Sequence, residues 1–228
     1  MVLIAHPTTQ IFDTAVEAAD AVARLVIDAV CARPTIVLGL ATGASMVPVY
    51  AALRQASNDG VDFSRITTFN LDEYLSDQPV YRTEMQERFF GPANVTRVHF
   101  PVAEEPYDAL IARHGGIDLQ ILGIGRNGHI AFNEPGAARD SVTRVVTLDD
   151  DTLAANAPNF VGRAQPKQAV TMGISSILAA REIVVLATGA AKKAAVRQAL
   201  HGPQTTDCPA SFLQDHPSVR WFLDRDSA

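Results

Sequence analysis

The feature that most restricts the fold of this chain is the alternation of short β-branched apolar runs with segments of helical apolar spacing. Residues 35–40 (TIVLGL) and 181–189 (REIVVLATG) are runs of the kind that form strands buried on both faces. Each is followed by a helical pattern, at residues 47–56 and 190–202. Because such alternation is typical of a mostly parallel sheet with helices on both faces, we expect one doubly wound, Rossmann-like α/β domain over residues 1–228.

The same pattern predicts further elements, without repeats, low-complexity tracts or linkers between them. The run at residues 141–148 is a strand candidate for an antiparallel position, and residues 149–166 are the least regular part of the chain. A helix over residues 13–32 is expected to begin with Asp13 as its N-cap. The other expected strands are residues 65–71, 95–100, 117–125 and 218–224, and the other expected helices are residues 83–90 and 174–180.

The composition limits the classes of protein that fit. Of 228 residues, 47% are hydrophobic, which is enough for one sizeable core. The net charge is −6 and lysine and arginine form no cluster, so we expect no nucleic-acid partner, because binding a phosphate backbone needs a concentrated basic face. An anionic metabolite still fits, since a pocket can be basic inside an acidic protein.

Three features bear on the compartment. Cys31 and Cys208 fit no zinc or disulfide framework, which suits a reducing cytoplasm. The first ten residues lack the basic start and long apolar run of a signal peptide. No stretch reaches the roughly 20 apolar residues that a membrane span needs. We therefore expect a cytoplasmic protein without membrane contact.

Polar side chains follow each of the central predicted strands. They are hydroxyls, acids, a histidine and a lysine. Ligands of open α/β sheets bind beyond the carboxyl ends of the strands, so this convergence predicts a site at that edge. In chain order the residues are Thr42, Gly43, Ala44 and Ser45, then Asp72 and Glu73, then Asn127, His129 and Glu134, and then Lys192.

Two of these loops have the composition of an anion-binding site. The loop ATGAS offers backbone N–H groups, two hydroxyls and the positive end of the following helix. Lys192 stands in the first turn of a later helix, from where it can reach an anion at the same edge. Equally, Thr42 and Ser45 can serve only as helix caps, and Lys192 can be solvated. The P-loop pattern is absent, and GIGRNG matches the dinucleotide fingerprint in its letters alone, because the residues after it do not read as a helix.

His129 is the natural proton shuttle of the set, because the pKa of histidine lies near neutrality. Glu134 and Asn127 are the neighbours able to orient it. Of the pair Asp72 and Glu73, one can be a general base while the other is structural or solvated; an isolated pair, like an isolated histidine, can also be wholly structural. Metal binding is disfavoured because no second histidine or cysteine lies at ligand spacing. No serine or cysteine stands in a nucleophile motif.

Six blocks in the same order resemble those of the glucosamine-6-phosphate deaminase family, also described as glucosamine/galactosamine-6-phosphate isomerases. The blocks are LGLATG, TFNLDEY, GIGRNGHIAFNEPG, TMGISSIL, GAAKKAAV and SFLQDHP. The resemblance implies that Asp72 moves a proton between C2 and C1 and that His129 helps to open the sugar ring, with Glu134 and Asn127 supporting it. It also implies that Thr42, Gly43, Ala44, Ser45 and Lys192 hold the phosphate.

The implied reaction converts glucosamine 6-phosphate and water to fructose 6-phosphate and ammonia, with no cofactor and no metal. The implied partner is a small-molecule sugar phosphate, and a monomer or a homo-oligomer both remain open. Galactosamine 6-phosphate is an alternative substrate, because the two sugars differ only at C4, away from the proton transfers. A 6-phosphogluconolactonase and a non-catalytic sugar-phosphate sensor are further alternatives; the joint presence of Asp72 and His129 favours catalysis.

Two positions depart from the pattern of this family. Relatives often have a phosphate-gripping arginine where the segment TLAANAPNF has Pro158, and Arg163 is the candidate replacement. Losing such a charge-assisted contact costs about 1.5–3 kcal/mol, on the order of tenfold or more in affinity. Met46 stands where a rigid proline usually begins the helix after the phosphate loop.

Overall fold

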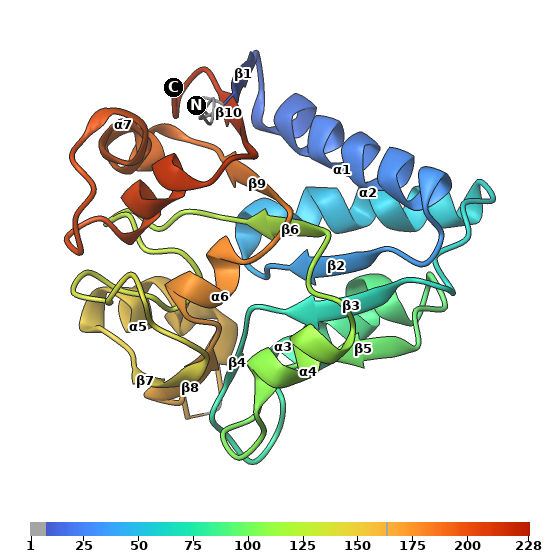
Figure 1. Cartoon of the computed structure of the whole chain (residues 1–228), viewed down its shortest axis with the longest axis horizontal. Helices are drawn as coiled ribbons and strands as arrows, with labels where there is room; N and C mark the ends of the chain where they lie inside the picture. The colour runs from blue at the N-terminus through green and yellow to red at the C-terminus, as the bar shows by residue number, and fades with distance from the viewer. Residues whose placement is uncertain (1–7, 163) are drawn as a thin grey trace.

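The computed structural model describes residues 8–162 and 164–228, and within them the main element is a seven-stranded sheet (Figure 1). All neighbouring strands of this sheet run parallel, as expected. Its central strands are buried along their whole length, which explains why their sequences are apolar without alternation. Across the sheet the strands are β1 (Thr8–Phe12), β10 (Val219–Asp224), β9 (Glu182–Ala187), β6 (Leu119–Leu122), β2 (Val37–Leu40), β3 (Thr67–Asn70) and β5 (Arg97–His99).

Helices cover both faces of the sheet, which confirms the doubly wound α/β architecture. α1 packs along α2 on one face. On the other face, Tyr107 of α4 packs against Phe69 of β3, with 5.6 Å between the ring centroids. Thr14 and Glu17 form a capping box at the start of α1, so Thr14 and not Asp13 is the N-cap. The helices are α1 (Ala15–Ala32), α2 (Val47–Asn58), α3 (Tyr81–Met85), α4 (Tyr107–Arg113), α5 (Asp150–Asn156), α6 (Ile174–Leu178) and α7 (Lys193–His201).

The strand order changes direction between β2 and β6. From β2 the chain continues outward to β3 and β5, and it then returns to the other side of β2 to form β6, β9 and β10. In open α/β sheets, ligands bind beyond the carboxyl ends of the strands at such a reversal. In Figure 1 these strand ends point toward the part of the molecule that contains α5.

A second, antiparallel sheet of three strands lies at the carboxyl side of the main sheet in the described part of the chain. Its order is β4 (Asp72–Tyr74), β8 (Gln168–Thr171) and β7 (Arg144–Thr147). The chain changes sheets at Leu71, whose N–H donates to Leu40 at 3.0 Å and whose carbonyl accepts from Met172 at 2.7 Å. The antiparallel strand expected at residues 141–148 is confirmed as β7, but the sequence did not show that Asp72 begins a strand of its own.

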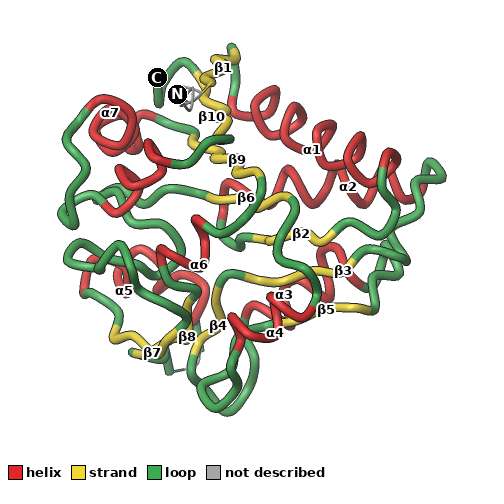
Figure 2. Tube along the Cα trace, viewed as in Figure 1, coloured by secondary structure: helices red, strands yellow, loops and turns green. Residues whose placement is uncertain are grey.

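Residues 149–166 contain more regular structure than the sequence indicated. α5 and a 3-10 turn at Ala157–Phe160 lie within this segment. Thr152 is the buried residue of α5, so no apolar stripe marks the helix in the sequence. Figure 2 shows α5 among loops beside the second sheet. The expectation of an irregular segment is therefore wrong for residues 150–160.

The two sheets share one hydrophobic core. Tyr74 of β4 and Ala169 of β8 belong to the same buried cluster as the central strands of the main sheet. A shared core holds the second sheet in a fixed position relative to the strand ends. Within residues 8–162 and 164–228, no helix is long and apolar enough to cross a membrane.

Candidate active site

The side chains singled out in the sequence follow the carboxyl ends of β9, β6, β2 and β3, which are consecutive in the sheet. Carboxyl ends of neighbouring parallel strands meet at one edge, so these loops border the same region. The histidine loop is also tied to the strand of Asp72. The N–H of Phe132 donates to Oγ1 of Thr171 at 3.1 Å, and Thr171 is the pairing partner of Asp72.

His129 and Glu134 form a hydrogen-bonded pair. Nδ1 of His129 lies 3.1 Å from Oε2 of Glu134. Asn127 donates to the same oxygen at 2.8 Å, and its Oδ1 accepts the backbone N–H of His129 at 3.2 Å. Asn127 therefore supports His129 indirectly, through the carboxylate of Glu134 and through the backbone of His129. With Nδ1 occupied, Nε2 is the ring atom available to a ligand.

Thr152 is a further donor to Glu134 that the sequence did not indicate. Its hydroxyl, on α5, hydrogen bonds to Oε1 of Glu134, and its side chain is buried. Burial acts to raise the pKa of Glu134, but the hydrogen bond and charge of His129, together with hydrogen bonds from Thr152 and Asn127, lower it to about 2. Glu134 is therefore ionised at neutral pH, with both oxygens held.

The imidazole of His129 fits because residue 125 is glycine. A Cβ at Gly125 would lie 2.3 Å from Nδ1 and Cε1 of the ring, which no side chain can accommodate. The N–H of Gly125 donates to the carbonyl of His129 at 2.8 Å and closes the turn. The side chain of His129 is nevertheless 25% exposed, so the ring is supported from behind and open to a ligand.

Asp72 is a buried carboxyl, 7% exposed, without an ion-pair partner in the described residues. Burial first, and then the negative charge of Glu73, raise its pKa to about 8, against the effect of a hydrogen bond from Thr42. Such a carboxyl is a stronger base than an ordinary aspartate. The contact also shows that Thr42, expected at the phosphate, faces Asp72.

Glu73 has a structural role that distinguishes it from Asp72. Its Oε1 accepts the backbone N–H groups of Val80 and Tyr81 at 3.0 and 2.9 Å, and its Oε2 accepts that of Arg82 at 2.8 Å. The carboxylate thus binds the free N–H groups at the start of α3. The sequence left open which member of the acidic pair is the base, and these contacts leave Asp72 as the candidate.

The loops after β2 and β9 have matching backbone geometry. Gly43 has φ 104° and Gly189 has φ 87°, a conformation that glycine adopts without strain. Each precedes a 3-10 turn, Ala44–Met46 or Ala190–Lys192, that leads into α2 or α7. No described atom lies within 4 Å of the place a Cβ would take on either glycine, so both loops face open space. No side chain caps α2, so Thr42 and Ser45 are not its caps.

The remaining predicted residues have different surroundings. Lys192 is half-buried at the second of these turns, and burial is the main cause that lowers its pKa. Met46 is buried in the core, and α2 keeps a proline, Pro48, in its first turn. Pro158 is exposed in its 3-10 turn, and Arg163 lies outside the described residues. No group of three or more metal-ligating side chains is found in the part of the chain that the structure describes.

Comparison with known proteins shows which family the chain belongs to. The family model described as glucosamine-6-phosphate isomerases/6-phosphogluconolactonase matches residues 11–221. A glucosamine-6-phosphate deaminase of Rhodopirellula baltica is 48% identical over 223 residues, which cover 91% of this chain and 89% of that protein. A solved structure of a monomeric glucosamine-6-phosphate deaminase matches with a TM-score of 0.90 and 37% identity, over 96% of this chain and 98% of the other.

A 6-phosphogluconolactonase from Leishmania guyanensis matches with a TM-score of 0.75 and 20% identity, over 97% of both chains. At that identity the likeness shows the fold alone. The chain belongs to the glucosamine-6-phosphate isomerase/6-phosphogluconolactonase family, as its motifs predicted. This chain is 48% and 37% identical to the two deaminases named above, whereas it shares only its architecture with the lactonase.

Proposed function

We propose that this protein converts glucosamine 6-phosphate and water to fructose 6-phosphate and ammonia. The observation that carries the proposal is that the hydrogen-bonded pair His129 and Glu134, after β6, and the buried carboxyl of Asp72, after β3, follow strand ends at the same edge of the sheet, with β2 between them. Opening an aldose ring needs a proton shuttle, and moving a proton between adjacent carbons needs a base on one face of the sugar. The activity named for the relatives at 48% and 37% identity supports the same reaction.

His129 is the group that we assign to ring opening. The ring opens when a proton leaves the O1 hydroxyl and the ring oxygen receives one as its bond to C1 breaks. Nε2 of His129 can carry this proton because Nδ1 is held by Glu134. The ionised Glu134, fixed by Asn127 and Thr152, orients the ring and stabilises the imidazolium that forms.

Asp72 is the group that we assign to isomerisation. The ionised carboxylate takes the proton from C2 of the open chain while a proton of the C2 ammonium group moves to O1, leaving an enolamine. The carboxylate then returns its proton to C1, so that C2 becomes a protonated ketimine. Water adds to C2 and ammonia leaves, which gives the ketone. An ammonium group on C2 also supplies the positive charge that the surroundings of Asp72 lack, and it favours the ionised carboxylate. This charge match supports an amino sugar over a lactone.

The pH dependence of kcat/KM should follow Asp72. Because kcat/KM reports the free enzyme and the base must be ionised, kcat/KM should rise about tenfold per pH unit on the acid side and level off above the pKa of the base. That pKa is about 8, owing to burial and to Glu73. Initial rates between about pH 6 and pH 9 measure the profile. A profile that is flat over this range, as expected of a base that titrates near the usual aspartate value of about 4, would contradict the assignment.

Thr152→Val is expected to lower kcat by about tenfold, since it removes one hydrogen bond from the carboxylate of Glu134 while keeping the shape of the side chain. The pKa of Glu134 should also rise, because one of the groups that lower it is gone. Thr152→Ser keeps the hydroxyl and should restore most of the rate. Equal kcat values and equal pH profiles for wild type and Thr152→Val would show that the contact does not position His129.

A coupled assay of ammonia release tests the reaction itself. Wild-type protein should release ammonia from glucosamine 6-phosphate and form fructose 6-phosphate in equal amount. Galactosamine 6-phosphate in the same assay decides between the C4 epimers. A lactonase would hydrolyse 6-phosphogluconolactone and release no ammonia from either amino sugar, and a sensor domain would bind the sugar phosphate without turnover.

We also propose that residues 1–228 act as one cytoplasmic domain whose partner is a small sugar phosphate, with no nucleic acid and no membrane. The shared hydrophobic core supports a single domain. The net charge of −6 supports the absence of a nucleic-acid partner. A solved relative at 37% identity is described as monomeric, which supports a monomer. Light scattering during gel filtration measures the mass in solution.

A further inference from the structure

Two cations stand on adjacent loops at the reversal of the sheet. β6 lies between β9 and β2 in the sheet, and Leu122 of β6 pairs with Val185 of β9. Arg126 follows four residues after Leu122, and Lys192 follows β9 at the end of its 3-10 turn. The loop of Arg126 is therefore flanked by the loop of Lys192 on one side and by the loop of Gly43 on the other. This is the edge at which α/β sheets of this topology bind ligands.

Neither cation has a counter-ion among the described residues. Arg126 is exposed and Lys192 is half-buried, and the ion pairs and side-chain hydrogen bonds of the described chain include neither. The carboxylate of Asp224, beneath the second loop, is already occupied by the N–H groups of Gly189 and Ser227. Unpaired cations at an open edge are the electrostatic complement of an anion.

The positive charges of Arg126 and Lys192 also repel each other. Burial first, and then the positive charge of Arg126, lower the pKa of Lys192. Two like charges held close together repel until an anion enters between them, so a bound anion stabilises both. The open space above Gly43 and Gly189 leaves room for it at this edge.

We propose that Arg126 and Lys192 together clamp the phosphate group of the substrate, which makes Arg126 a specificity-determining residue. The inference rests on the proposed function. A phosphate ester carries about −1.5 to −2 charges at pH 7, which matches two cations. A guanidinium binds two phosphate oxygens at once, which the single ammonium of Lys192 cannot do. Arg126 also directly precedes Asn127, so phosphate binding tethers the turn that holds His129.

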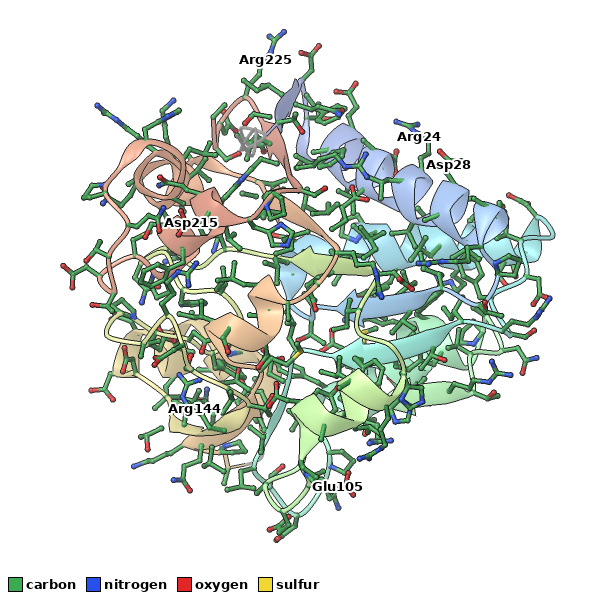
Figure 3. The ribbon with its side chains drawn as sticks, in the orientation of Figure 1. Arg24, Asp28, Glu105, Arg144, Asp215 and Arg225 are labelled. Carbon is green, nitrogen blue, oxygen red and sulfur yellow. The ribbon has the colours of Figure 1, made fainter. Side chains whose placement is uncertain are left out.

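Arg126→Ala is expected to raise KM for glucosamine 6-phosphate about tenfold or more, because charge-assisted hydrogen bonds are lost, while kcat changes much less. Arg126→Lys keeps one charge and should give an intermediate KM. Arg24→Ala is the matched control: Arg24 is an exposed arginine on α1 (Figure 3), and its removal should leave KM unchanged. Because Arg126 is exposed, Arg126→Ala should fold normally, and its thermal unfolding temperature, compared with that of the wild type, checks this.

Inorganic phosphate separates this inference from the proposed reaction, because its binding needs no turnover. Calorimetric titration should show phosphate affinity reduced about tenfold in Arg126→Ala and unchanged in Arg24→Ala. Loss of phosphate binding in Arg126→Ala supports the clamp even if the wild type releases no ammonia, a result that would overturn the proposed function alone. Equal KM and equal phosphate affinity in Arg126→Ala and Arg24→Ala overturn the clamp.

Discussion

Asp72→Asn should reduce the turnover of glucosamine 6-phosphate by about 10²–10⁴-fold, which is the usual contribution of a positioned general base. Asparagine keeps the size of the side chain and can still hydrogen bond to Thr42, but it cannot accept the proton from C2. KM should change little, since the proposed phosphate contacts of Lys192 and Arg126 remain. Steady-state ammonia release measures the loss, and titration with fructose 6-phosphate shows whether the site still binds.

The same variant should be at least as stable as the wild type above about pH 8. In the folded protein the pKa of Asp72 is about 8, against an ordinary value of 3.8. The folded state therefore binds the proton more tightly, so the stability that this group contributes is present at low pH and is lost as pH rises between these two values. Asparagine does not ionise, so the Asp72→Asn variant does not lose this stability as the pH rises. Melting temperatures of Asp72→Asn well below the wild type at every pH would mean that the lost turnover reflects misfolding.

The main sheet was predictable because its central strands are buried on both faces. An apolar run such as residues 35–40 admits few other structures, and the helices between such runs confine the chain to a parallel sheet. β1 and β4 left weaker signals. β1 is an edge strand with mostly exposed residues, and β4 has three residues, too few to show an alternation. α4 and β8 are likewise short, and neither was predicted.

The candidate site was predictable where its members are near in sequence or follow a strand. Asn127, His129 and Glu134 lie within one turn, and their hydrogen bonds follow from that closeness. Thr152 reaches Glu134 from a separate helix, a contact set by tertiary packing and by no sequence period. The roles of Asp72 and Glu73, one as base and one as structural carboxylate, could not be assigned from the residues alone. Adjacent strand residues point to opposite faces, and the pattern does not indicate which face binds the ligand.

Arg144 illustrates a second limit of the sequence. It is a half-buried arginine on β7 (Figure 3), and burial lowers its pKa. Its guanidinium donates to Oδ1 of Asn133 at 2.9 Å, and Asn133 in turn donates to the carbonyls of Ile130 and Met172. Arg144 thus supports the segment between His129 and Glu134 from the second sheet. A lone arginine in a strand gives no sign of such a contact.

Glu73→Ala is expected to lower the free energy of unfolding by about 3 kcal/mol or more, since each buried donor left without a partner costs about 1–3 kcal/mol. The N–H groups of Val80 and Tyr81 both bind Glu73, and both residues are buried, so water cannot readily replace the carboxylate. Urea unfolding with linear extrapolation measures the change. Glu87→Ala, an exposed glutamate in the turn after α3, is the control and should be nearly neutral.

Glu73→Gln links this structural carboxylate to the proposed chemistry. Glutamine keeps one acceptor oxygen, so the loss of stability should be smaller than for alanine, but the negative charge is gone. That charge is the second cause, after burial, of the raised pKa of Asp72. The acid limb of kcat/KM should therefore move to lower pH in Glu73→Gln, in a protein that still folds. An acid limb that stays in place would mean that the group titrating in kcat/KM is not Asp72, because this carboxyl cannot lose its charged neighbour and keep the same pKa.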